Sequence, residues 1–130
     1  MSTKVRYTTF DCRDPRAVAE FWAIALSYEI DAPNETAGEI LLKDPSGEGP
    51  SLGFMRVPES KVAKNRVHLD LFVTETSLEE EVERLVAAGA RAIETLRDPS
   101  EGYVDPCIWT VMQDPEGNEF CVLEQMSRRS

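Results

Sequence analysis

The chain has 130 residues, a formal net charge of −10 and a hydrophobic fraction of 42%. This size and composition predict one domain with a substantial core. The acidic charge argues against a nucleic-acid partner and a membrane surface, because both require patches of Lys and Arg. The chain begins without an apolar leader, and its three cysteines lack Cys-x-x-Cys spacing. We therefore expect a cytoplasmic protein.

The first half of the chain is predicted to fold as strand, helix and three strands. Residues 5–12 carry strand-favouring side chains. Asp14-Pro15 then predicts a helix start, since Asp is a good N-cap residue and Pro fits the first helical position. A short strand is expected around residues 28–30. A hairpin over residues 39–57 should turn at Asp44-Pro45-Ser46-Gly47.

A polar linker over residues 58–65 precedes a second run of the same elements. Residues 67–73 predict a strand, and Ser77-x-x-Glu80 is a capping box for a helix that Gly89 ends. The apolar stripe of this helix comprises Leu78, Val82, Leu85 and Val86. A strand over residues 92–96, a loop over residues 97–106 and a closing hairpin follow. The sequence thus predicts a single domain of two βαβββ modules, about residues 5–57 and 66–125.

The tip of the closing hairpin carries the clearest likeness to a known family. Its sequence is Asp114-Pro115-Glu116-Gly117-Asn118-Glu119-Phe120. With the element order and the Asp14-Pro15 helix start, it resembles the vicinal oxygen chelate superfamily of glyoxalase I, bleomycin resistance proteins and extradiol dioxygenases. Residues 64–70 and the Phe21-Trp22 helix resemble its glyoxalase-like subgroup common in actinobacteria. The resemblance implies an α+β fold in which two modules form a curved mixed sheet around a cleft, and it implies homodimers.

The metal-binding positions of this superfamily can be followed along the chain. Its enzymes hold a divalent ion with His, Gln or Glu from the first and last strands of each module. The resemblance places these positions at Tyr7, at His68, at Cys121 and at Gly53 or Met55. His68 is the only strong candidate ligand, whereas zinc usually requires three or four protein ligands. We therefore predict no cofactor, with a divalent metal as the disfavoured alternative.

Strand alternation divides residues 66–73 between two faces. The apolar set is expected to pack beneath the helices and comprises Val67, Leu69, Leu71 and Val73. The other set is expected to line the cleft and comprises Arg66, His68, Asp70 and Phe72. For Trp109, the unknown pairing register leaves open which face of its strand is inward. The predicted ligand-binding residues are Tyr7, Met55, Arg66, His68, Asp70, Trp109 and Cys121.

His68 and Asp70 are the candidate catalytic residues. An imidazole titrates close to neutral pH and is a natural general base. Asp70 is a candidate to orient the imidazole or to supply an oxygen ligand, and a solvated carboxylate is the simpler interpretation. Cys121 is expected to be a small buried hydrophobe. As a nucleophile it would require a lowered pKa, for which His68 is the candidate neighbour.

Three functions are compatible with this pattern. The favoured one is a small-molecule binder without a complete metal site, as in the bleomycin resistance proteins. The alternative is a glyoxalase-like lyase or isomerase that uses His68 as general base or metal ligand. A module that docks on another protein is third. Glyoxalase I itself lacks support because most of its ligands are missing, and an extradiol dioxygenase requires two His beside a carboxylate.

Overall fold

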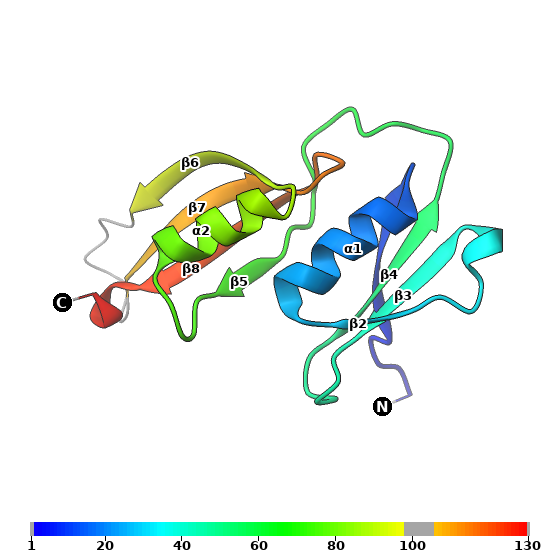
Figure 1. The fold of residues 1–130 in the computed structure, drawn as a ribbon, viewed down its shortest axis with the longest axis horizontal. Coiled ribbons are helices and arrows are strands. Elements are labelled where there is room, and N and C mark those ends of the chain that lie inside the picture. Colours follow the sequence, from blue (N-terminus) through cyan, green and yellow to red (C-terminus); the bar gives the residue numbers. More distant parts are fainter. Residues whose placement is uncertain (1, 98–105, 130) are drawn as a thin grey trace. The chain divides into compact units, whose positions relative to one another are not determined.

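The computed structural model describes residues 2–97 and 106–129, and Figure 1 shows its course. The chain divides into two compact units, Met1–Val62 and Ala63–Ser130. The division falls inside the predicted linker. Most of the predicted loop over residues 97–106 lies outside the described residues. That the two units act as a single domain stays a prediction.

The first unit is one helix on a four-stranded mixed sheet. Its strands lie in the order β1-β4-β3-β2, with β1 parallel to β4 and the other pairs antiparallel. In chain order the elements are β1 (Tyr7–Cys12), α1 (Pro15–Leu26), β2 (Glu29–Asp31), a 3-10 turn (Glu35–Ala37), β3 (Glu39–Lys43) and β4 (Ser51–Arg56).

The helix α1 begins and packs as the sequence predicts. The Asp14 carboxylate accepts a hydrogen bond from the Ala17 backbone N–H at 3.2 Å, which caps the first turn. Phe21 and Trp22 are buried, and the Trp22 ring lies 5.6 Å from the ring of Phe10 on β1. These aromatic side chains therefore form the core of the first unit, and the Phe21-Trp22 pair is not a ligand surface.

The second unit repeats this arrangement. Its strands lie in the order β5-β8-β7-β6, with β5 parallel to β8. The elements are β5 (Asp70–Phe72), α2 (Leu78–Ala87), β6 (Arg91–Arg97), β7 (Cys107–Gln113), β8 (Glu119–Gln125) and a 3-10 turn (Met126–Arg128). The predicted α+β class and the two βαβββ modules, each with a mixed sheet, are confirmed.

The helix α2 covers one face of the second sheet. Its N-cap is the predicted one, since the Ser77 hydroxyl accepts from the Glu80 N–H at 3.1 Å. The buried residues between helix and sheet are Leu78, Leu85, Ile108, Met112, Phe120 and Val122. The prediction that Val86 belongs to the apolar stripe is wrong, because the sheet accepts only the narrower stripe of Leu78, Val82 and Leu85 and Val86 is exposed.

The strand β5 is shorter than the sequence predicts. It begins at Asp70, and Val67, which was expected to pack beneath a helix, is 75% exposed. The segment before β5 is held by side chains instead of strand pairing: the Asn65 N–H donates to the Glu119 carboxylate at 2.8 Å. The first backbone bond to β8 runs from the Cys121 N–H to the Leu69 carbonyl at 2.9 Å. The expected alternation therefore fails at Val67 and holds at buried Val73.

No helix among the described residues combines the length and apolar character needed to cross a membrane.

The two Asp-Pro-x-Gly turns are built by their aspartates. In the second, buried Asp114 accepts hydrogen bonds through Oδ1 from the backbone N–H groups of Glu116 and Asn118, both at 2.9 Å. Its Oδ2 accepts from Asn118 Nδ2, also at 2.9 Å. In the first turn, Asp44 accepts from the Ser46 N–H at 2.9 Å but is partly exposed. The same sequence signal thus forms one buried and one more solvated turn.

We expect Asp114→Ala to lower the free energy of unfolding by about 1–3 kcal/mol, because buried N–H groups would lose their acceptor. The matched change Asp44→Ala should cost less, since water can replace a partly exposed carboxylate. Urea denaturation of both variants checks this ranking. Equal losses, or a larger loss in Asp44→Ala, would contradict the role assigned to burial.

Candidate functional site

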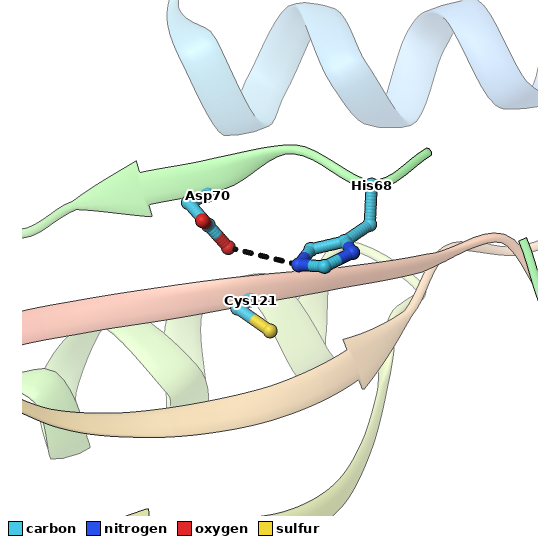
Figure 2. A group of neighbouring side chains, drawn as sticks. All are labelled: His68, Asp70 and Cys121. Atoms are coloured by element: carbon cyan, nitrogen blue, oxygen red, sulfur yellow. Dashed lines mark ion pairs between the residues drawn. The ribbon is translucent and has the colours of Figure 1, made fainter. Parts of the chain in front are cut away.

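Three predicted site residues of the second unit meet in one cluster (Figure 2). His68, Asp70 and Cys121 each place one potential ligand atom within 4.8 Å of the other two. His68 Nε2 lies 3.3 Å from Asp70 Oδ1. We call these three residues the His-Asp-Cys cluster. His68 lies on the segment leading into β5, Asp70 is the first residue of β5, and Cys121 lies on the neighbouring strand β8.

Strand pairing brings the cluster together. Asp70 and Cys121 are partners in the parallel β5–β8 ladder, so their side chains lie on the same face. That face is opposite the one beneath α2, because Phe120 and Val122 on either side of Cys121 are buried. His68 lies two residues before Asp70 and turns toward it (Figure 2).

The family signature also fixes the segment that carries His68. Glu119 lies directly after the turn, and its Oε1 accepts a hydrogen bond from the Asn65 N–H. Its Oε2 accepts a second, longer hydrogen bond from Gln113 Nε2 at 3.5 Å. Asn65 Nδ2 reaches the Asn118 side-chain oxygen at 3.5 Å. The β7–β8 turn is therefore a physical support for His68, three residues beyond Asn65.

The surroundings keep Cys121 protonated. Burial raises the pKa of the Cys121 thiol, the negative charge of Asp70 raises it further, and so does the hydrogen bond between the two side chains. The nearby positive charge of Lys64 opposes these effects to a smaller extent. Reactive cysteines require a lowered pKa. The environment therefore disfavours the nucleophile interpretation of Cys121.

The cluster supplies one nitrogen, one oxygen and one sulfur as potential metal ligands. His68, Asp70 and Cys121 are the residues that would hold an ion in the second unit. This donor set suits zinc better than magnesium or calcium, which prefer oxygen ligands. Donors around a tetrahedral zinc lie about 3.5 Å apart, so the cluster would have to contract and the thiol would have to lose its proton.

The corresponding position in the first unit offers no ligand. Thr9 pairs with Gly53 in the β1–β4 ladder as Asp70 pairs with Cys121 in the β5–β8 ladder. This register favours Gly53 over Met55 as the counterpart of Cys121. A Cβ at Gly53 would lie 2.9 Å from Thr9 Oγ1, closer than real Cβ atoms come. Sequence reasoning left these two positions open because the first hairpin is longer.

The other predicted binding residues are divided between the units. Trp109 pairs with Leu123, which puts it on the same face as Cys121 and answers the open question of its orientation. Arg66 is exposed on the segment before β5. Tyr7 and Met55 share the face of the first sheet that α1 does not cover, but four strand positions separate Tyr7 from the partner of Met55. A cleft shared by all seven residues stays a prediction.

Comparisons with known proteins agree with this fold. The sequence model of the glyoxalase-like domain family matches residues 7–123. A glyoxalase/bleomycin resistance protein/dioxygenase family enzyme from Burkholderia phytofirmans PsJN is similar with a TM-score of 0.73 and 20% identity, over 94% of this chain and 98% of that chain. A glyoxalase-related enzyme from Fulvimarina pelagi is similar with a TM-score of 0.67 and 20% identity, over 93% of this chain and 87% of that chain.

A fosfomycin resistance protein from Listeria monocytogenes, solved with Mn(II) and a dihydroxypropylphosphonic acid, has a TM-score of 0.72 and 16% identity over 94% of this chain and 90% of that chain. No curated protein sequence matches. The likeness to the actinobacterial subgroup stays a prediction. The family model matches nearly the whole chain, and the fold is similar to that of solved members of this superfamily. This chain therefore belongs to the glyoxalase-like domain family of the vicinal oxygen chelate superfamily.

Proposed function

We propose that this protein binds a small organic molecule at the His-Asp-Cys cluster and does so without a complete metal site. The observation that carries the proposal is the convergence of His68, Asp70 and Cys121 within 4.8 Å. The His68 and Asp70 side chains are 44% and 56% exposed, so a ligand can reach them. Few convergent polar groups on an otherwise apolar surface are typical of small-molecule sites.

Two features support an organic ligand over a resident metal ion. The first unit has Gly53 where a metal-coordinating side chain would stand, and the raised pKa of Cys121 opposes formation of a thiolate. The Listeria protein was solved with an organic phosphonic acid together with Mn(II). That complex supports the proposal that this fold can hold an organic molecule. A homodimer and a cytoplasmic location stay predictions, and light scattering of the purified protein tests the first.

Protein purified without chelator should contain far less than one divalent ion per chain, because the donor group found among the described residues includes a thiol whose pKa is raised. Elemental analysis by mass spectrometry measures this content directly. His68→Ala should leave the low content unchanged. A stoichiometric ion that disappears in His68→Ala would overturn the metal-free part of the proposal.

Thermal-shift screening of small organic compounds should find ligands whose stabilisation depends on His68. At a concentration 100-fold above Kd, a ligand raises the free energy of unfolding by about 2.7 kcal/mol. We expect His68→Ala to remove most of this gain, and the exposed α2 variant Glu83→Gln to retain it. A ligand that stabilises wild type and His68→Ala equally would place binding elsewhere.

Proton transfer is the second candidate function, and the 3.3 Å contact between His68 Nε2 and Asp70 Oδ1 favours it. A carboxylate beside an imidazole orients the ring toward its substrate. His68 would then take a proton from carbon next to a carbonyl, as a lyase or isomerase of this family would require. Asp70 would act as a positioning residue.

Deuterium exchange into hydroxyacetone, followed by proton NMR, tests this chemistry without knowledge of the natural substrate. Wild type should accelerate exchange above buffer, and His68→Gln should lower the rate by about 10²–10⁴-fold, the usual contribution of a general base. Asp70→Asn should also lower the rate, because an amide holds the ring less firmly than a carboxylate does. Wild-type exchange at the buffer rate would leave binding without catalysis as the function.

Cys121 should behave as an unreactive thiol. Because burial and Asp70 raise its pKa, iodoacetamide should alkylate Cys121 at neutral pH more slowly than it alkylates free cysteine. Asp70→Asn removes the negative charge, lowers the pKa of the thiol and should speed alkylation. Peptide mass spectrometry separates Cys121 from Cys107 as an internal reference. Rapid labelling of wild-type Cys121 would instead indicate an activated thiolate.

A further inference from the structure

A hollow of about 270 Å³ lies on the second unit beside the His-Asp-Cys cluster. Its lining comes from β5, β7, β8 and the segments after β5 and β8, and comprises Phe72, Val73, Thr74, Cys107, Leu123, Gln125 and Arg128. Phe72 pairs with Leu123 as Asp70 pairs with Cys121. The hollow and the cluster therefore share one face of the sheet, opposite α2.

The lining of this hollow is mostly apolar, and its polar members are Thr74, Gln125 and Arg128. The Phe72 ring is 77% exposed, so a ligand group that covers it would remove much apolar surface from water. An exposed aromatic ring also accepts another ring in a stacked or edge-on arrangement. At about 270 Å³ the hollow is slightly below the usual range for drug-sized ligands. It therefore fits one ring or one branched alkyl group.

Arg128 at the rim does not make the hollow a site for anions. Its NH1 donates to the Val73 carbonyl at 3.1 Å and to the Glu124 carboxylate at 3.0 Å. Its NH2 donates to the Thr76 carbonyl at 3.1 Å. Buried Glu124 also pairs with Arg129, which pairs with Glu79 as well, so the charges of the two guanidinium groups are matched by two carboxylates within the protein. Arg128 is a positioning residue that holds the wall formed by Val73 and Thr74, and the hollow suits a neutral group.

The spacing links the hollow to the cluster. Phe72 follows Asp70 by two residues and Leu123 follows Cys121 by two, and a strand rises about 3.3 Å per residue. The two sites are thus separated by about 7 Å along the strands. A compact molecule with a polar group at one end and a ring at the other spans this distance.

We propose that the ligand of this protein is a neutral amphipathic molecule whose aromatic or branched alkyl end fills the hollow over Phe72 and Leu123 while its carbonyl or hydroxyl end contacts His68 and Asp70. This inference rests on the proposed function and assigns the chemical class of the ligand. It makes Phe72 and Leu123 the residues that determine specificity.

The test compares two probes that share a polar end: 4-phenyl-2-butanone, which carries a ring two methylenes from its carbonyl, and 2-butanone, which has none. NMR titrations of wild type measure both dissociation constants. We expect the ring to improve affinity by about tenfold or more. Saturable shifts should appear at the amides of Phe72 and Leu123 and also at those of His68 and Cys121.

Two variants remove the hollow in opposite ways. Phe72→Ala deletes an exposed ring with little risk to folding, and Leu123→Trp fills the space. Each variant should abolish the preference for the aromatic probe. The control is Ile93→Ala on β6, which also removes a partly exposed apolar side chain and should preserve the preference. Retention of the preference in both pocket variants overturns the inference.

The pattern of shifts separates this inference from the proposed function. Saturable shifts confined to His68 and Cys121 overturn the role of the hollow and leave ligand binding at the cluster intact. Shifts confined to Phe72 and Leu123, unchanged by His68→Gln, overturn the spanning ligand and the cluster as its polar anchor. The absence of any saturable shift at millimolar probe overturns the assigned ligand class.

Discussion

The buried carboxylate of Asp114 organises the second unit. By accepting backbone and side-chain hydrogen bonds within the β7–β8 turn, it fixes the register in which Val111 faces Cys121. The same turn presents Glu119 to the backbone of Asn65, and so fixes the segment that carries His68. This turn, outside the His-Asp-Cys cluster, thus helps to determine where the three side chains meet, because it sets the register of the β7–β8 pair and holds the segment before β5.

The chemistry of the cluster follows from how its members limit one another. Asp70 faces the imidazole of His68 on one side and the thiol of Cys121 on the other. It lies 3.3 Å from the imidazole, where it can orient the ring, and its negative charge disfavours a thiolate at Cys121. One carboxylate therefore supports His68 as a proton-transfer group while it opposes Cys121 as a nucleophile or metal ligand. These opposite effects are the physical reason for preferring an organic ligand, held by hydrogen bonds, over an ion.

Local signals in the sequence predicted the elements well where they act through the backbone. Asp14-Pro15, Ser77 and the two Asp-Pro-x-Gly turns set element ends by hydrogen bonds within a few residues, and these were confirmed. Val67 was misplaced because alternation presumes strand pairing that begins only near Leu69. The meeting of His68 with Cys121 depends on a parallel ladder that pairs Asp70 with Cys121, 51 positions further along the chain. The resemblance suggested it, whereas periodicity alone gave no register.

Gly53 makes the two halves of this duplicated chain chemically unequal. Its missing side chain leaves room for Thr9, and even a single added carbon would collide with that neighbour. A mutation at this one position is therefore a poor route to a matching pair of sites, since the Thr9 hydroxyl would have to move as well. Among the described residues, the second repeat therefore holds the His-Asp-Cys cluster, whereas the first repeat has no side chain at the position that corresponds to Cys121.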